Sequence, residues 1–214
     1  GFLGVYNACS TMSESMLLAS VLVDGGYLNN AICATSSHFA TAERQYRYPL
    51  EQGTTRPAQS QWTVTGAGAN LISRADKGVS ITAAAIGHVV DYGVTDANNM
   101  GAAMAPAVAH TLLDFFAERK TTPAEYDLIL TGDLGALGSR LLKTLLKKKG
   151  VEINNHLDCG ELIYNMDENE FQGGSGAGCS AVVFNSYIYK RMLIGDYKKV
   201  LFIATGALMS TTSA

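Results

Sequence analysis

Two distant stretches of this chain follow the same outline. The matched pairs, all at one offset without a gap, are Cys9 and Cys179, Ser10 and Ser180, Gly25 and Gly195, Tyr27 and Tyr197, and Ala34-Thr35 and Ala204-Thr205. In each copy a small-residue turn with a Cys opens a helical pattern, a Gly ends it, and an apolar strand follows. This repeat predicts a duplicated α/β fold, with helices sandwiched between sheets and a site where the two halves meet.

Hydrophobic periodicity predicts the elements of the first half, which we assign to residues 1–100. We expect strands at 1–6 and 29–36, a helix at 10–23, a polar loop at 37–61, and strands at 62–73 and 79–90. The turn Ala75-Asp76-Lys77-Gly78 separates the last two strands. The simplest arrangement of these two is an antiparallel hairpin.

The second half is assigned to residues 101–214. We expect helices at 104–118, 139–149 and 180–194, and strands at 126–130 and 198–205. Pro106 is predicted to start or kink the first of these helices, because proline lacks the backbone N–H. The alternation of strand and helix favours βαβ packing.

Charge and cysteine spacing exclude several classes of protein. The net charge is −3 and the basic residues are scattered, apart from Lys147-Lys148-Lys149 at a predicted helix end, so nucleic acid is not an expected partner. Four separate cysteines without a CxxC pair argue against a disulfide framework or structural zinc, and favour an intracellular setting. No metal site or cofactor is predicted.

The apolar runs are short. The longest, such as 200–204, fall far short of the roughly 20 residues that span a bilayer. We therefore expect no transmembrane segment, and any membrane association would be peripheral. The chain also lacks an initiator Met and opens inside a predicted strand, so we interpret it as a fragment of a longer protein.

Cys9 is the residue with the clearest chemical potential. A cysteine between a strand and a helix lies near backbone N–H groups and the positive end of the helix dipole, both of which stabilise a thiolate. The alternative is a small apolar residue in a buried turn. A thiolate in acyl chemistry also needs a base or donors, commonly His or Asn. Only His38 is well placed, because His88 and His110 suit structural roles better and His156 lies in a loop that we expect to be exposed.

Two other groups of residues could bind an anion. The run Gly173 to Gly178 precedes a helix and could present backbone amides, although it lacks the Walker ending and close packing explains the glycines equally well. Arg44 and Arg47, with His38, offer donors suited to a carboxylate; a solvated loop is the alternative.

Several blocks of residues carry a resemblance to a known family. They are Asn7-Ala8-Cys9-Ser10-Thr11, Ala34-Thr35-Ser36-Ser37-His38, Ala42-Glu43-Arg44-Gln45, Thr63-Val64-Thr65-Gly66, Met104-Ala105-Pro106, Asp127 to Leu134 and Gly173-Gly174-Ser175-Gly176. Over essentially its whole length the chain resembles the stage V sporulation protein AD family of spore-forming Gram-positive bacteria. The resemblance implies an α/β, thiolase-like fold of two pseudo-symmetric halves with layered sheets and helices, lacking the N-terminal part of the first half.

The departures from catalytic relatives point away from catalysis. Cys9 matches the nucleophile position of thiolases and β-ketoacyl synthases. Where the synthases carry a His after the strand at 126–130, this chain has Thr131-Gly132-Asp133, and where they carry a second His or Asn, it has Gly174-Ser175. Loss of the base and the donors should cost orders of magnitude in rate.

The resemblance therefore implies a binding role. It implies a non-catalytic protein that binds dipicolinic acid, alone or as its calcium chelate, for uptake into the developing spore. The partners implied are other subunits of a membrane transport complex at the spore inner membrane, with this protein as the peripheral member, and a homodimer is the family-level expectation. The residues expected to bind the ligand are Cys9, Ser36, Ser37, His38, Arg44 and Gly174. The alternative is an acyltransferase or condensing enzyme with Cys9 as nucleophile and His38 as base.

Overall fold

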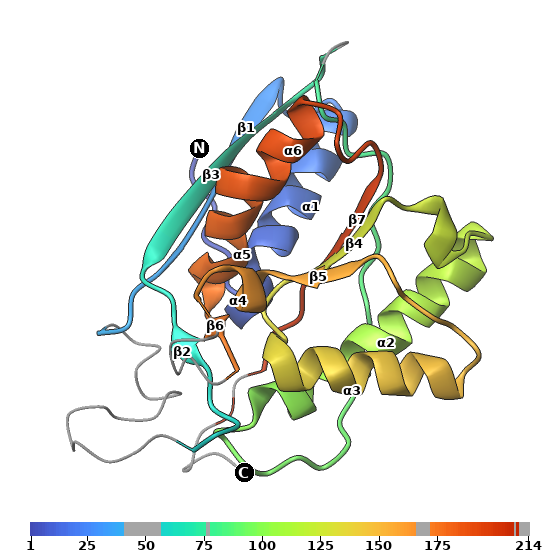
Figure 1. Cartoon of the computed structure of the whole chain (residues 1–214). Coiled ribbons are helices and arrows are strands. Elements are labelled where there is room, and N and C mark those ends of the chain that lie inside the picture. The colour runs from blue at the N-terminus through green and yellow to red at the C-terminus, as the bar shows by residue number, and fades with distance from the viewer. Residues whose placement is uncertain (41–56, 76–77, 166–171, 208, 210–214) are drawn as a thin grey trace.

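Sheets and helices alternate in four layers (Figure 1). The structure, a computed structural model, describes residues 1–40, 57–75, 78–165, 172–207 and 209. The elements of the first half are η1 (Ala8–Ser10), α1 (Thr11–Asp24), β1 (Asn30–Ser37), β2 (Trp62–Thr63) and β3 (Gly66–Ser73). Those of the second half are α2 (Met100–Arg119), η4 (Pro123–Glu125), β4 (Leu128–Thr131), α3 (Gly135–Lys148), β5 (His156–Asp158), α4 (Cys159–Leu162), β6 (Gly174–Ser175), α5 (Ala177–Val183), η6 (Phe184–Ile188), α6 (Tyr189–Leu193) and β7 (Val200–Ile203).

The central helical layer lies between the two larger sheets. Helices α1 and α5 pack on the sheet β1-β3, and their other side meets the sheet β5-β4-β7. Met12 of α1, Cys179 of α5 and Leu130 of β4 belong to one buried cluster there. The predicted sandwich of helices between sheets is confirmed.

Helices α2 and α3 cover the far face of the sheet β5-β4-β7 (Figure 1). They cross closely at Gly101 and Gly138, where a Cβ on Gly101 would lie 2.9 Å from the Gly138 nitrogen. Leu112, Ile129 and Leu142 are fully buried in this second core. Successive side chains of a strand point to opposite faces. Ile129 of β4 therefore packs in this second core, whereas Leu128 and Leu130 pack in the first.

Helix α2 is long and apolar. By length and composition alone its 20 residues, Met100–Arg119, could cross a membrane, and the absence of a transmembrane segment stays a prediction. Half of its most apolar window is buried inside the protein. A core helix passes the same test, and the packing of α2 against α3 accounts for its apolar content. Pro106 lies inside this helix, and Asn99 caps its start by accepting from the Ala102 N–H.

The two copies of the repeat end their helices in the same way. In the first copy the Gly26 and Tyr27 amides donate to the carbonyls of Val23 and Leu22, which is a Schellman motif with Gly26 at φ +77°. In the second copy Gly195, at φ +87°, and Asp196 make the equivalent bonds. Gly26, rather than Gly25, is therefore the structural counterpart of Gly195, and the offset between the copies shortens by one residue here.

Strand pairing in the first half differs from the predicted hairpin. Strand β3 pairs antiparallel with β1, from Asn30 opposite Ser73 to Ser37 opposite Gly66. Residues 79–90 form no strand, so the predicted hairpin is wrong. The segment instead runs along α2, where Gly87 contacts Thr111 and the Tyr92 hydroxyl lies 3.2 Å from His110 Nε2. Strand pairing depends on which partner is nearby in space, which alternation in the sequence does not reveal.

Residues 1–6 also form no strand in this structure, so that prediction is wrong as well. Phe2 is 99% exposed. The second half agrees better: the strands predicted at 126–130 and 198–205 are present as β4 and β7, and the sheet has the parallel order β5-β4-β7. Strand β5 was not predicted, and the expectation that His156 lies in an exposed loop is wrong, because it is buried in this strand. The assignment of residues 1–100 and 101–214 to separate halves remains a prediction, and the short parallel pair of β2 with β6 joins them.

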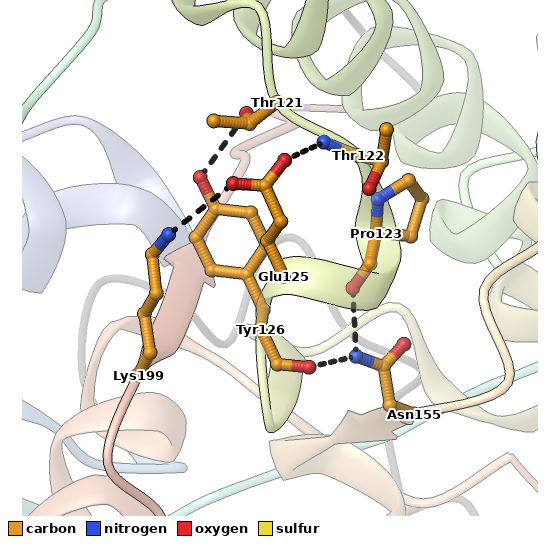
Figure 2. A network of polar contacts seen from close by, with 7 residues as sticks. All are labelled: Thr121, Thr122, Pro123, Glu125, Tyr126, Asn155 and Lys199. Atoms are coloured by element: carbon orange, nitrogen blue, oxygen red, sulfur yellow. Dashed lines mark hydrogen bonds and ion pairs between the residues drawn. The ribbon is translucent and has the colours of Figure 1, made fainter.

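A network of polar contacts connects the segments that lead into the amino ends of the parallel strands (Figure 2). The Lys199 ammonium lies 3.8 Å from a Glu125 carboxylate oxygen and 4.5 Å from the centre of the Tyr126 ring. The Asn155 amide donates to the carbonyls of Pro123 and Tyr126. These contacts tie η4 to the segments entering β5 and β7, and they leave the opposite, carboxyl edge of the sheet to the site described next.

Candidate functional site

Cys9 lies on a tight backbone elbow. Ala8, just before it, adopts φ +47°, a left-handed conformation that is costly for a residue with a Cβ. Three hydrogen bonds hold the elbow: Ser10 Oγ donates to the Asn7 carbonyl, Thr11 Oγ1 donates to the Ala8 carbonyl, and Thr11 Oγ1 accepts from the Asn7 N–H. The predicted position of Cys9 at the start of a helix is confirmed, with η1 leading directly into α1.

The second half supplies the surroundings of this elbow. Gly206, just after β7, approaches so closely that a Cβ there would lie 2.6 Å from the Asn7 carbonyl oxygen. Ser175, in β6, places its Oγ 3.7 Å from Cys9 Sγ. Cys9 is therefore buried where the two halves of the chain meet.

A line of hydrogen bonds leads from Cys9 to a buried carboxylate. Ser175 Oγ donates to Asp133 Oδ2 at 2.6 Å, and the Gly176 N–H donates to the same oxygen at 2.9 Å. Asp133 follows β4, and its side chain is 1% exposed. Asp133 thus reaches Cys9 through Ser175.

The direction of these bonds decides what the thiol can do. A serine hydroxyl has one proton, and in this geometry that proton is directed to Asp133. Toward Cys9, Ser175 can then only accept, so the S–H of Cys9 donates. This arrangement suits a neutral thiol, whereas a nucleophilic thiolate would need a donor or a base at that place.

A second buried carboxylate lies beside the first. Asp158, at the end of β5, accepts from the Leu134, Gly135 and Glu161 amides and from the Thr131 hydroxyl. It therefore caps both α3 and α4. Burial, followed by the charge of Asp133, raises the pKa of Asp158 to about 7, against the lowering effect of its hydrogen-bond donors.

His156 completes the polar chain at the other end. Its Nε2 lies 2.9 Å from Thr131 Oγ1, which is 2.6 Å from Asp158 Oδ2. Because the Thr131 hydroxyl donates its proton to the hydrogen bond with Asp158, it accepts from His156, whose Nε2–H is the donor. Burial, with a smaller effect of Lys143, lowers the pKa of His156 to about 4, so the imidazole is neutral at physiological pH.

Gln61 fixes the loop that carries Ser175. Its amide nitrogen donates to the carbonyls of Asp133 and Gly174, at 2.8 and 3.0 Å. The adjacent strand β2 pairs with β6, so Trp62 lies opposite Gly174 and Thr63 opposite Ser175. The Gly-rich run 173–178 is therefore closely packed rather than open: a Cβ on Gly173 would lie 2.2 Å from the Gly160 carbonyl oxygen.

The structure separates the residues predicted to form the pocket. Ser37 is buried, donates to the Val64 carbonyl and accepts from the Gly178 N–H at the start of α5. Ser36 points to the opposite, exposed face of β1. His38 is exposed, and its Nδ1 accepts from the Ala40 N–H. Gly174 is buried in β6 close to Cys9, through its neighbour Ser175. Arg44 and Arg47 lie outside the described residues.

Several polar residues of the site were not among those predicted to bind the ligand. They are Gln61, Thr131, Asp133, His156, Asp158 and Ser175. The available signal was the position of Asp133 two residues after the apolar strand β4, where the carboxyl ends of parallel strands gather. Among the described residues, no group of three or more His, Cys, Asp or Glu side chains is arranged to hold a metal ion.

Comparisons with known proteins relate the chain to one sequence family and one fold. The family model of stage V sporulation protein AD matches residues 1–214. The chain is 50% identical over 212 residues to stage V sporulation protein AD of Bacillus subtilis (strain 168), and covers 63% of that relative's length. Among solved structures, it is similar to 3-oxoacyl-[acyl-carrier-protein] synthase III from Aquifex aeolicus VF5, with a TM-score of 0.60 and 14% identity over 95% of this chain and 62% of that one.

The structural likeness shows a thiolase-like fold, and the sequence matches show the family. The chain spans about two thirds of the length of its curated relative. It belongs to the stage V sporulation protein AD family.

Proposed function

We propose that this protein uses the thiolase-like fold to bind dipicolinic acid for uptake into the developing spore, without catalysing a reaction. The observation that carries the proposal is the line from Cys9 through Ser175 to Asp133. The resemblance to condensing enzymes implies that such an enzyme would hold its base and donors here. A serine hydroxyl held by a carboxylate faces the thiol instead, and because a hydroxyl is a poorer base than an imidazole, this arrangement favours binding over acyl transfer.

The charge of the site bears on the form of the ligand. Dipicolinic acid carries two carboxylates on a flat pyridine ring, and a dianion placed near the buried Asp133 carboxylate would be repelled. In the calcium chelate the cation neutralises both ligand carboxylates, and the repulsion falls. We therefore propose the calcium chelate as the bound form, oriented by polar groups around Cys9.

Calorimetric titration of the full-length protein tests this proposal. Dipicolinic acid is titrated with and without calcium into wild type, Cys9→Ala and Cys33→Ala. Cys33 is a matched control, because it is also a buried thiol of the first half but donates to the Ser15 carbonyl between β1 and α1. We expect saturable binding that needs calcium, weakens about tenfold or more in Cys9→Ala and stays unchanged in Cys33→Ala. The absence of binding under both conditions would remove the proposal.

Acyl transfer is the second candidate, favoured by the position of Cys9 at a strained elbow before a helix. Incubation of the full-length protein with acyl-coenzyme A, followed by mass spectrometry of the Cys9 peptide, separates the two functions. We expect no adduct. A covalent acyl group on Cys9, absent in Cys9→Ser, would reverse the preference.

The proposal extends to assembly. We propose that the protein acts as a homodimer and as the peripheral member of a membrane transport complex with other subunits. Membership of a sporulation family supports this setting. Light scattering of the full-length protein after gel filtration should give twice the mass of one chain; a monomer at micromolar concentration would contradict the dimer.

A further inference from the structure

The outer face of α3 is unusual in its charge. The helix and the residue that follows it carry five cations, all exposed: Arg140, Lys143, Lys147, Lys148 and Lys149. Residues 135–150 contain no Asp or Glu, although the whole chain has a net charge of −3. A face that only needs to be soluble usually mixes both signs, so this segregation calls for an explanation.

Intramolecular contacts explain only part of this face. The helix dipole favours cations in the last turn, which accounts for Lys147 and Lys148. It does not account for Arg140 and Lys143, which lie in the first two thirds of the helix. Lys147 has an ion pair with Glu152 at 3.6 Å, but both side chains are largely exposed, so this pair contributes little.

The spacing of these cations has a cost. Lys143 and Lys147 are four residues apart, and Arg140 and Lys143 three apart, so like charges face each other on the helix surface and destabilise it. The helix cannot rotate about its axis to separate these charges, because Leu142 and Leu146 on its opposite face are buried against α2 and the sheet. Arg140, Lys143 and Lys147 are thus held in one outward-facing row, which Lys148 and Lys149 extend at the end of the helix.

We propose that this row docks the protein onto a membrane surface that contains anionic phospholipid. Four of the five cations are lysines, whose compact, flexible charges suit a diffuse layer of headgroups better than paired recognition of a single carboxylate or phosphate. No aromatic side chain lies between them in the helix, so stacking on nucleic acid bases is not provided for. The apolar face is committed to the core, so attachment is electrostatic, without insertion.

Vesicle co-sedimentation of the full-length protein tests this docking. Vesicles of phosphatidylglycerol with phosphatidylcholine are compared with phosphatidylcholine alone, at low and high salt. The test variant is Lys143→Glu with Lys148→Glu. The control is Lys190→Glu with Lys198→Glu, which changes the net charge equally but lies on the other side of the sheet β5-β4-β7, near α6.

We expect wild type and control to bind anionic vesicles, more weakly at high salt, and the α3 variant to bind at least about tenfold more weakly. Equal binding to both kinds of vesicle, or equal loss in both variants, would overturn the proposal. A third outcome also contradicts it: the wild type does not bind vesicles but binds soluble polyglutamate, and the α3 variant loses that binding. The partner would then be an acidic protein. Dipicolinic acid binding does not depend on this face, so the two proposals can fail separately.

Discussion

The two cysteines of the internal repeat show how one local structure acquires two different environments. Cys9 and Cys179 both lie where a helix begins in the central layer. Cys9 faces Ser175 and, through it, Asp133. Cys179 is completely buried in the apolar cluster with Met12 and Leu130, and burial, followed by the charge of Asp133, raises the pKa of its thiol well above the ordinary value.

The surroundings of the two cysteines differ because different elements pack against the two helix starts, and not because the helices themselves differ. Each helix start is met by elements of the other half: the Gly-rich run of the second half contacts Cys9, while the first half's Ser37 and Gly66 press against Gly178, just before Cys179. The first contact places the Ser175 hydroxyl 3.7 Å from the Cys9 sulfur, within hydrogen-bonding distance. A duplicated fold can therefore keep one polar site and turn its counterpart into core.

The largest effect should come from the residue before Cys179. A Cβ on Gly178 would lie 2.5 Å from the Gly66 carbonyl oxygen and 2.7 Å from Ser37 Oγ. Gly178→Ala should lower the free energy of unfolding by about 3 kcal/mol, because backbone atoms cannot move aside easily. Urea denaturation checks this. A loss below about 1 kcal/mol would show that α5 can shift on the sheet β1-β3.

The next largest effect should come from replacing each cysteine by serine, and the loss of stability should differ between the two positions. Cys179→Ser places a hydroxyl in apolar surroundings and should cost about 2 kcal/mol. Cys9→Ser places it beside Ser175 Oγ, where it can donate, and should cost less than about 1 kcal/mol. Thermal and urea unfolding of both variants give the values. Equal losses would mean that the polarity around Cys9 does not matter for its packing.

Two residues of the second half, His156 and Asp158, should make the stability of the protein depend on pH. Unfolded His156 is protonated below pH 6.5 while the folded one stays neutral down to about 4, so His156 makes stability rise with pH across that window. Asp158 acts in the opposite direction between 3.8 and about 7, because the folded chain keeps its proton longer. The two effects largely cancel between pH 4 and 6.5.

Single variants should expose these opposing slopes. The stability of Asp158→Asn should increase with pH between 4 and 6.5 relative to wild type, and that of His156→Asn should decrease, each by at most about 1.4 kcal/mol per pH unit. Urea titrations at several pH values measure this. Parallel curves for all three proteins would contradict the assignment. On the first half's sheet, the corresponding inward residues Cys33, Thr35 and Ser37 do not titrate in acid.

The smallest effect should come from the residue before Cys9. Ala8→Gly relieves the left-handed conformation at φ +47°, but it also increases the entropy of the unfolded chain. These terms are of similar size, so the free energy of unfolding should change by less than about 0.5 kcal/mol. A large stabilisation would show that the elbow stores strain, and a large loss that the Ala8 methyl, next to Gly206, is a packing contact.

Local patterns predicted the helices well and the sheet partners poorly. The start of α1, its stop near Gly26 and the strands β4 and β7 follow from capping residues and apolar periodicity, which act over a few neighbours. The short strand β5 was not predicted. The predicted pairing of 62–73 with 79–90 failed, because β3 finds β1 across a long loop instead. Propensity describes how a strand fits a pleated surface, not which strand lies beside it.

The layered α/β class and the place of Cys9 at a helix start could be predicted from the sequence, since each depends on residues close together in the chain or on a visible repeat. Local patterns did not reveal that Asp133 reaches Cys9 through Ser175, that Ser36 faces away, or that Cys179 is part of the core. Those outcomes depend on how two halves pack, and a contact between residues far apart in the chain is set by the whole fold rather than by any local pattern.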